Sequence, residues 1–287
     1  MGCVLLFYKY VTIRYPVQMQ KWQRRLCESL NLKGRIIIAH EGINGTLGGT
    51  AEETALYIEA LKAHELFHDV DMKTSQGSAQ DFPRLSVVVR PEIVHLGIND
   101  NQVSAEQAGC HVSPEEAHAM LSHKSDDLLV FDARNKYESD IGAFEGAIKP
   151  PLDNFRELPG YVDDNLEQFR DKTVLMYCTG GVRCERASAY LKQKEVAREV
   201  LQISGGIHRY VEAYPDGFFR GKNYVFDNRT ALPVTHDTLG ACVYCEKPCS
   251  DYSACSNSMC REQLLICTQQ DSLHISQQCP QMCRPQR

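Results

Sequence analysis

The pattern of apolar and polar positions divides the chain into two regions of strands and helices, joined by a mixed connection at residues 91–112. In the first region, residues 4–11 predict a strand. Trp22–Leu30 predicts a helix, because apolar side chains recur there at every fourth position. Residues 34–49 predict two strands around a glycine-rich bend, with Asn44-Gly45 as the turn.

The rest of the first region predicts one more helix and one more strand. Thr50–His64 is expected to be helical, and the polar stretch Lys73–Gln80 leads to a strand at Leu85–Arg90. The resulting order, βαββαβ, is typical of a ferredoxin-like α+β sheet with two helices on one face.

The second region predicts a parallel sheet. Its first helix, His111–His123, carries Ser113 as N-cap, Pro114 at its first position and Glu116 in a capping box. Strands separated by helical patterns follow, and strands that alternate with helices favour a parallel arrangement. The three expected strands are Asp127–Ala133, Lys172–Cys178 and Glu199–Ile203.

Cys178 is the strongest candidate for chemistry, because it ends a strand immediately before a helix. Backbone N–H groups converge at such a position and the helix dipole is positive there, so a thiolate is favoured over a thiol. The following loop residues would surround the sulfur, with Arg183 adding a positive charge. These cradle residues are Thr179, Gly180, Gly181, Val182 and Arg183, and a helical pattern begins at Cys184.

Two alternatives compete with this interpretation of Cys178. A buried core cysteine is one, although such a residue does not require a Gly-Gly loop. A cysteine phosphatase is the other, but its chemistry needs an arginine six residues after the cysteine, where this chain has Cys184. The loop is therefore one residue short for phosphate and suits a smaller group, such as a persulfide sulfur.

Composition and length add further limits. A chain of 287 residues with 43% hydrophobic positions is expected to form two or three domains. No run of 18 apolar residues occurs, so no membrane span is predicted. The N-terminus has neither a basic segment nor a cleavage site of a signal peptide, which favours a cytoplasmic location and leaves the nucleus open.

Cysteines are concentrated near the C-terminus, where eight of the 13 lie between Cys242 and Cys283. The odd total and the clustering argue against a disulfide framework and favour a metal-binding tail. A structural zinc site is predicted, with reduced thiols in a mobile tail as the alternative. The predicted ligands are Cys242, Cys245, Cys255 and Cys260, with Cys249 and Cys267 as spare candidates.

Charge is distributed unevenly along the chain. The net charge is −6, but residues 1–35 hold seven basic side chains against the single acid Glu28. This excess of positive charge indicates either a nucleic-acid face or a solvated helix surface. The basic residues concerned are Lys9, Arg14, Lys21, Arg24, Arg25, Lys33 and Arg35.

Several motifs in the second region resemble a rhodanese domain. They are Phe131–Arg134, Gly142–Ile148, the loop Cys178–Arg183 and Ser204–Ile207, within the block Ser113–Tyr214. The stretches EGINGTLGG, CTGGVRCERASAYL, GGIHRY and GKNYVFDNR further resemble the tRNA uridine hydroxylase group of rhodanese-like proteins, with the animal branch most similar.

This resemblance implies three domains in an α/β protein. An acylphosphatase-like (ferredoxin-like) domain is expected over residues 1–92 and a rhodanese-type parallel sheet with flanking helices over residues 113–221. A Cys-rich, zinc-binding tail is expected over residues 235–287. The chain departs from the group after Cys267, because Gln270 stands where a further cysteine is expected, which puts a second metal site in doubt.

The resemblance also implies the chemistry. Cys178 is expected to carry sulfane sulfur as a persulfide between a small sulfur donor and a thiol acceptor. The alternatives are 5-hydroxylation of the wobble uridine of tRNA by the same cysteine, and a non-enzymatic binding module. Cys184 is a resolving thiol or a packing residue, and Asp132 with Arg134 is expected to form an ion pair that supports the loop. No cofactor is expected at the rhodanese site, and no membrane partner.

Overall fold

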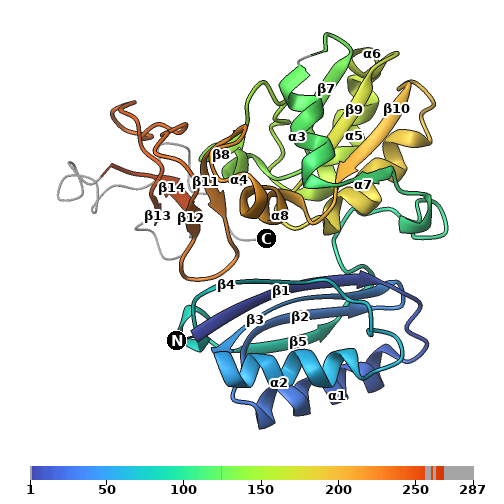
Figure 1. The fold of residues 1–287 in the computed structure, drawn as a ribbon, viewed down its shortest axis with the longest axis vertical. Helices are drawn as coiled ribbons and strands as arrows, with labels where there is room; N and C mark the ends of the chain where they lie inside the picture. The colour runs from blue at the N-terminus through green and yellow to red at the C-terminus, as the bar shows by residue number, and fades with distance from the viewer. Residues whose placement is uncertain (1, 124, 256–259, 261–262, 268–287) are drawn as a thin grey trace.

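The computed structural model describes residues 2–123, 125–255, 260 and 263–267. Figure 1 shows a five-stranded sheet with α1 and α2 beneath it, and a second domain above the opposite face of this sheet. A third region, containing β11 to β14, lies beside the second domain. Within the described part of the chain, no helix has both the length and the apolar character that crossing a membrane requires.

The N-terminal domain is an α+β sandwich of one sheet and two helices. Its sheet has the strand order β4-β1-β3-β2-β5, antiparallel except for the parallel pair β2 and β5. The helices pack on one face around a core that includes Phe7, Leu47 and Tyr57. The elements are β1 (Gly2–Tyr10), α1 (Pro16–Ser29), β2 (Lys33–Ala39), β3 (Gly42–Thr50), α2 (Ala51–Lys62), β4 (Met72–Gln76) and β5 (Leu85–Val89).

The turn predicted at Asn44-Gly45 is wrong. The β2–β3 hairpin turns at residues 40–41 instead, and Asn44 and Gly45 lie inside β3, paired with β1. A Cβ atom on Gly45 would lie 2.4 Å from Cζ of Phe7, so this glycine makes room for an aromatic ring. The glycines of this stretch therefore allow close packing. The sequence alone does not distinguish such glycines from those of a turn.

The sequence also missed an edge strand. The first half of the polar stretch Lys73–Gln80 forms β4. The strand predicted as the fourth of this domain is therefore its fifth, β5. β4 pairs only with β1 and lies at the end of the sheet. An edge strand presents one side to solvent and needs little apolar content, which explains why its sequence looked like a loop.

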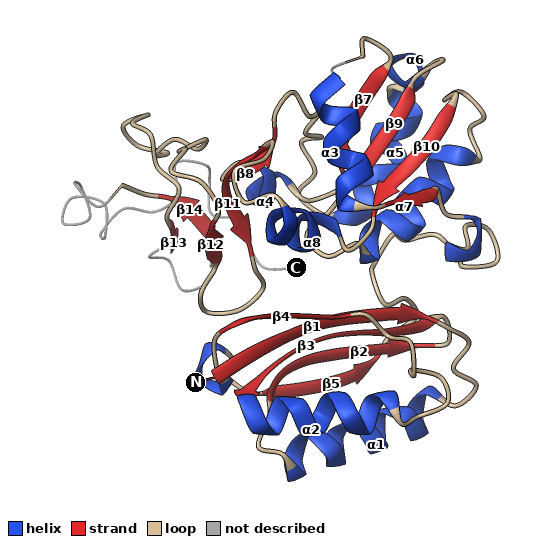
Figure 2. Ribbon diagram, in the orientation of Figure 1, coloured by secondary structure: helices blue, strands red, loops and turns tan. Residues whose placement is uncertain are grey.

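The second domain contains the predicted parallel sheet, with strand order β6-β10-β9-β7. Helices cover both faces, and along β9 the side chains alternate between two cores: Val174 and Met176 in one, Leu175 and Tyr177 in the other. Figure 2 shows this sheet surrounded by helices. The elements are β6 (Cys110–Val112), α3 (Pro114–His123), β7 (Leu128–Asp132), α4 (Lys136–Ser139), β8 (Gly142–Phe144), α5 (Leu158–Asp164), α6 (Leu166–Phe169), β9 (Thr173–Tyr177), α7 (Val182–Lys192), β10 (Glu199–Ile203) and α8 (Gly206–Ala213).

Two predicted helices of this domain differ in detail from the structure. Helix α3 begins at Pro114 and not at His111, which lies in β6, a strand that the sequence pattern did not predict. The predicted capping box of α3 is present, since Ser113 N donates to Glu116 and Glu116 N donates to Ser113 Oγ. Helix α7 starts two residues earlier than predicted, at Val182. Its charged residues Glu185 and Arg186 are buried, with Arg186 fully enclosed, because the N-terminal domain packs against them.

The third region is built on short strands. β11 (Phe219–Tyr224) pairs with β8 and with β12 (Ala231–Pro233), while β13 (Tyr252–Ala254) pairs with β14 (Gln263–Leu265). Its core contains Ile141 of the second domain together with Cys242, Cys249 and Leu265. The tail is therefore packed onto the rhodanese-like fold rather than separate from it.

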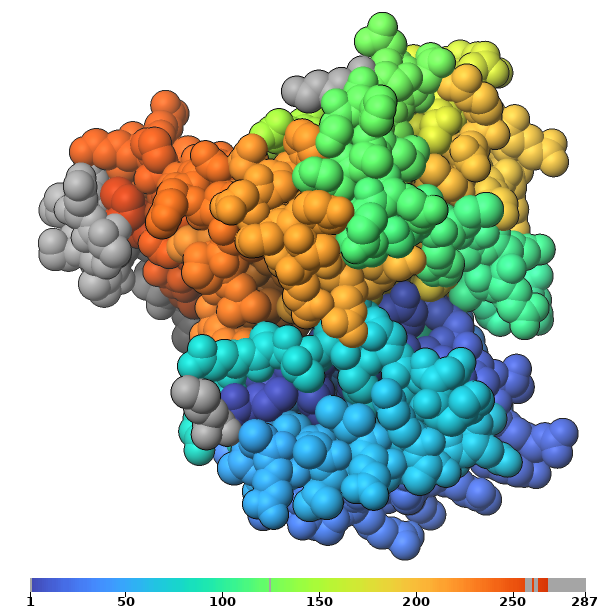
Figure 3. Space-filling view, viewed as in Figure 1, coloured from blue at the N-terminus to red at the C-terminus, as the bar shows by residue number. Residues whose placement is uncertain are grey.

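The N-terminal domain and the rest of the chain share a polar interface. Tyr8 of β1 donates a hydrogen bond to Glu185 (2.9 Å), and Tyr10 donates to the carbonyl of Val182 (3.1 Å). The space-filling view shows the two parts in close contact along this boundary (Figure 3). Both acceptors belong to α7, so the first turns of this helix lie against β1.

Candidate active site

Cys178 lies at the carboxyl end of β9, immediately before the loop that leads into α7. Its side chain is fully buried, and the N–H group of Gly181 donates to its Sγ atom at 3.1 Å. The loop is held from below by α8, because Ile207 N donates to the carbonyl of Cys178 and His208 N donates to that of Thr179. The sulfur thus has a backbone N–H donor from the loop, and the role of residues 179–183 as an anion cradle stays a prediction.

Opposing effects act on the acidity of Cys178. Burial raises its pKa, but a hydrogen bond from Cys184, the charge of Arg183 and the backbone N–H groups of Arg183 and Cys184 lower it, to about 5. The pKa of Cys184 is raised well above its ordinary value, by burial and by the neighbouring Cys178 sulfur. At neutral pH Cys178 is therefore a thiolate, and Cys184 keeps its proton and donates it.

Glu138 of α4 is a site residue that the sequence analysis missed. Its carboxylate forms a bidentate ion pair with Arg183, with 2.7 Å from Nη2 to Oε2, and it accepts a hydrogen bond from the Thr179 hydroxyl at 3.2 Å. Both Glu138 and Arg183 are buried. The pair fixes both ends of the loop. The only signal in the sequence is a capping box, in which Asn135 N donates to Glu138 Oε1 at 3.1 Å.

A cleft of about 1010 Å³ leads to Cys178 from the N-terminal sheet. One wall is the face of β1, β2 and β3 that α1 and α2 do not cover (Figure 1). The other wall includes the loop after Cys178 and the end of β11. Side chains of basic and aromatic character line it, among them Tyr8, Arg35, Arg90, Arg156 and Phe226. The volume is at the upper end of the ~300–1,000 Å³ typical of small-molecule pockets.

Comparison with known proteins gives matches over almost the whole chain. Residues 2–93 match the UPF0176 acylphosphatase like domain, residues 113–213 the rhodanese-like domain and residues 220–284 the rhodanase C-terminal region. A Shouchella clausii protein named tRNA uridine(34) hydroxylase is 42% identical, over 98% of this chain and 88% of the relative. A Corynebacterium kroppenstedtii protein of the same name is 38% identical, over 98% of this chain and 97% of the relative.

The chain belongs to the tRNA uridine(34) hydroxylase family of rhodanese-domain proteins. This confirms the resemblance and the fold class predicted from the sequence, and supports the prediction of an enzyme. Among solved structures, the NMR structure of a rhodanese-like domain from Anabaena is 17% identical, covers 44% of this chain and 86% of that chain, and has a TM-score of 0.33.

In this family member the glycines of the loop serve the contact between domains. Gly181 has φ +105°, a conformation that favours glycine, and a Cβ atom there would lie 2.6 Å from the Tyr8 hydroxyl. A Cβ atom on Gly180 would lie 2.9 Å from Leu6 Cδ2. The N-terminal domain thus packs directly on the loop that follows Cys178.

Asp132 and Arg134 form the expected ion pair, behind the loop rather than in the cleft. Both are fully buried, with Arg134 Nη2 2.7 Å from Asp132 Oδ2. Tyr177 donates its hydroxyl to Asp132 at 2.7 Å, and Arg134 donates to the carbonyl of Gly142. The pair joins β7, β8 and β9, so its contacts are those of a structural support.

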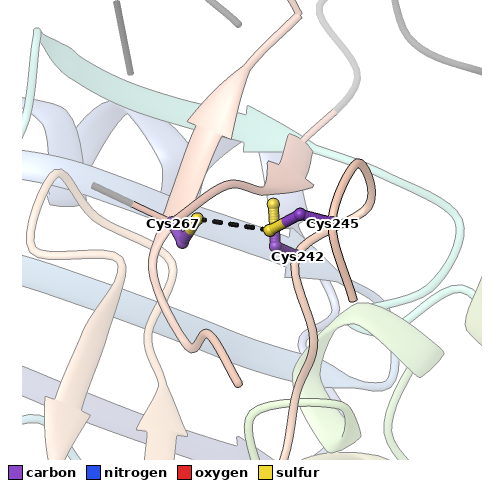
Figure 4. Close-up of side chains that lie close together, drawn as sticks. All are labelled: Cys242, Cys245 and Cys267. Atoms are coloured by element: carbon purple, nitrogen blue, oxygen red, sulfur yellow. Dashed lines mark hydrogen bonds between the residues drawn. The ribbon is translucent and has the colours of Figure 1, made fainter. Parts of the chain in front are cut away.

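The tail brings three thiols of this rhodanese-domain protein together. The sulfur atoms of Cys242, Cys245 and Cys267 lie within 4.8 Å of one another, and those of Cys245 and Cys267 are 3.6 Å apart (Figure 4). Burial raises the pKa of Cys242, but N–H groups of Cys267, Tyr244 and Cys245 lower it, to about 7. Clustered thiols, one of which ionises readily, fit a thiophilic metal such as zinc.

The structure brings together two of the four predicted zinc ligands, Cys242 and Cys245, and the four-cysteine ligand set stays a prediction. Cys267, a spare candidate, joins the Cys242–Cys245 pair, while Cys255 and Cys260 lie in a neighbouring cluster with Leu264 and Ile266. The spacing of the cysteines did not indicate that Cys267, which follows β14, lies next to Cys242 and Cys245. The sequence after Cys267, which includes Gln270, lies outside the described residues.

Proposed function

We propose that this chain hydroxylates C5 of the wobble uridine in tRNA, with Cys178 as the nucleophile. The observation that carries the proposal is a thiolate-favouring sulfur at the end of a wide, basic cleft. A small sulfur donor needs no such space, whereas a nucleotide in an RNA chain does. The relatives named tRNA uridine(34) hydroxylase support the same substrate, and a tRNA substrate is consistent with the cytoplasmic location predicted from the sequence.

The chemistry starts with conjugate addition of the Cys178 thiolate to C6 of the uracil ring. A bond forms between sulfur and C6, and the displaced electron pair resides on C5 and O4. C5 then attacks an oxygen atom of an external oxidant. With a hydroperoxide, the O–O bond breaks, a C–O bond forms at C5 and an alkoxide leaves. Loss of the C5 proton and expulsion of the thiolate restore the ring.

Nucleoside analysis of tRNA tests the proposal directly. Cells that lack the protein are expected to lose 5-hydroxyuridine-type nucleosides, and the native chain restores them. Cys178→Ser, which removes the nucleophile and keeps the shape, does not. Unchanged nucleosides in the deficient cells contradict the proposal.

Sulfur transfer is the second candidate, favoured by the short loop and by the N–H group of Gly181 at 3.1 Å from the sulfur. In this reaction Cys178 takes a sulfane sulfur from a small donor and passes it to a thiol. Mass spectrometry after thiosulfate treatment is expected to find one added sulfur on Cys178. Full transferase activity in Cys178→Ser rules it out. A binding module without catalysis has less support, because such a module does not need an ionised cysteine.

For the tail, we propose one bound zinc ion, held by Cys242, Cys245 and Cys267. The ion would hold β13 and β14 against the second domain, where Tyr252 donates to the carbonyl of Tyr137 at 2.6 Å. Metal analysis of the purified protein is expected to find one zinc per chain. Its absence, together with free titration of all tail thiols, contradicts the proposal.

A further inference from the structure

We propose that the cleft above Cys178 is a binding groove for single-stranded RNA, in which arginines hold the backbone phosphates, Phe226 stacks on a base and the Asn135 side chain selects uridine. The inference rests on the proposed function only for the identity of the reacting base. The residues concerned come from separate parts of the chain, namely Arg35, Arg90, Asn135, Arg156 and Phe226.

The charge in the cleft is not neutralised. Arg35, Arg90 and Arg156 are exposed, and none has a carboxylate within 4 Å in the part of the chain that the structure describes. The one carboxylate on the cleft wall, Glu92, already accepts from the N–H groups of Leu96 and Gly97. Exposed guanidinium groups without a carboxylate partner attract the phosphates of a nucleic acid.

Phe226 provides an aromatic surface next to these arginines. It is 57% exposed, which is unusual for a phenylalanine beside a cleft. Tyr224 meets it edge-on, with ring centroids 5.3 Å apart, and the Arg183 guanidinium lies 5.7 Å from the ring centre. The ring is therefore held in place but retains open surface, as in proteins that stack nucleobases on aromatic side chains.

Asn135 offers a means of distinguishing bases. Its Oδ1 atom is buried, faces no hydrogen-bond donor among the described residues, and belongs to the cleft wall. An acceptor without a partner is costly unless a ligand supplies the donor. The N3–H group of uracil is such a donor, whereas N3 of cytosine is an acceptor, so this amide favours uridine.

The two walls of the groove are joined by side-chain contacts, and Cys178 is fully buried between them. Arg186 pairs with Glu41 at 2.5 Å, Arg209 with Asp71 at 2.5 Å, and Arg229 donates to the carbonyl of Gln76 at 2.6 Å. These contacts join the N-terminal domain to α7, to α8 and to the segment after β11. A base must therefore leave its helix to reach Cys178, which favours single-stranded loops.

The basic residues of the N-terminal segment divide between the two faces of the sheet. Of the seven, only Arg35 lines the cleft, whereas Lys21, Arg24 and Arg25 belong to α1 on the covered face. Lys9 is paired with Asp69. The net charge of residues 1–35 thus does not mark the groove, and an α1 arginine is a suitable control.

The test measures binding of a fluorescein-labelled RNA oligonucleotide with a single uridine to the full chain carrying Cys178→Ala. Arg35→Ala, Arg90→Ala and Arg156→Ala are each expected to weaken binding and to reduce the slope of log affinity against log salt by ~0.7. Phe226→Leu weakens binding about tenfold and leaves the slope unchanged. Arg25→Ala changes neither quantity.

Specificity is tested with the same protein. Replacing uridine by cytidine is expected to weaken binding, and Asn135→Ala removes this preference. A blunt duplex of the same sequence is expected to bind more weakly than the single strand. Equal affinity for duplex and single strand, or cleft variants that bind like the Arg25→Ala control, overturns the inference.

The two proposals fail in different ways. If the cleft variants lose RNA binding while tRNA from deficient cells keeps its hydroxylated uridine, the groove stands and the hydroxylase assignment falls. If hydroxylation depends on Cys178 while the cleft variants bind RNA normally, the hydroxylase stands and the groove falls. As a folding control, the cleft substitutions are also made in the chain that retains Cys178. A rate of Cys178 alkylation close to that of the native chain shows that these variants fold.

Discussion

The two cysteine clusters of this chain differ in what holds them. Cys178 and Cys184 lie in a buried core, where a strand end, a helix start and the Glu138–Arg183 pair fix the sulfur. The tail thiols lie among short strands with a small core. In the first cluster the protein sets the acidity of the sulfur, and in the second a metal ion would have to set the local structure.

Replacing Cys178 is expected to have the largest effect on the first cluster. Cys178→Ser removes the one cysteine among the described residues that lines the cleft, so hydroxylated uridine is expected to disappear from tRNA. The matched change Cys27→Ser affects a buried thiol in the N-terminal core and leaves the chemistry in place once folding is verified. Retained modification in Cys178→Ser contradicts the role of the core cluster.

Glu138→Gln is expected to destabilise the catalytic loop next most strongly. The change leaves Arg183 buried without its charged partner, which costs about 3–5 kcal/mol of unfolding free energy. Urea unfolding measures the loss. Glu145→Gln is the control, because its pair with Arg220 is part-exposed and worth under about 1 kcal/mol. Equal losses in the two variants would show that the buried pair has no special role.

Removing the Cys184 thiol tests the hydrogen bond to Cys178. Cys184→Ala is expected to raise the pKa of Cys178, because the thiolate loses a donor. Alkylation at mildly acidic pH therefore slows, and its midpoint moves to higher pH. Cys184→Ser retains a donor and is expected to stay closer to the native protein. An unchanged midpoint in Cys184→Ala means that the backbone N–H groups and Arg183 suffice.

The smallest effect at the active site is expected from the tail. Cys267→Ala removes one of the three clustered sulfurs and is expected to lower the zinc content, with little change in Cys178 alkylation. Cys260→Ala, outside this cluster, is expected to retain zinc. The opposite result, with zinc lost only in Cys260→Ala, supports the ligand set predicted from spacing.

Features of the site with local sequence signals were predicted, whereas those that depend on contacts between distant residues were not. The parallel sheet and the position of Cys178 followed from apolar strands and a Gly-Gly loop, which are local signals. Glu138 could not be assigned, because its contact with Arg183 spans 45 positions and its own surroundings suggested only a helix cap. Cys267 was given too little weight for the same reason, since the hydrogen bond from Val243 N to the carbonyl of Leu265 brings two distant segments, and with them Cys242 and Cys267, together.

The burial of charged residues in α7 was also not predictable from the sequence. Glu185 and Arg186 are charged residues of α7, yet both are enclosed by contacts to Tyr8 and Glu41 of the N-terminal domain. A helix that packs between two domains buries polar groups as well as apolar ones, and amphipathicity within one helix cannot reveal the second domain.

The ionisation of Cys178 is the central claim, and the pH dependence of its alkylation tests it most directly. Its pKa is lowered in the fold, so the thiolate is present at neutral pH. The stability that the thiolate contributes is complete above the ~8.5 of an unfolded thiol and is lost as the pH falls from there through about 5. The predicted rate of iodoacetamide modification is level above pH 7 and half-maximal near pH 5. A midpoint near the ~8.5 of an ordinary thiol contradicts the account.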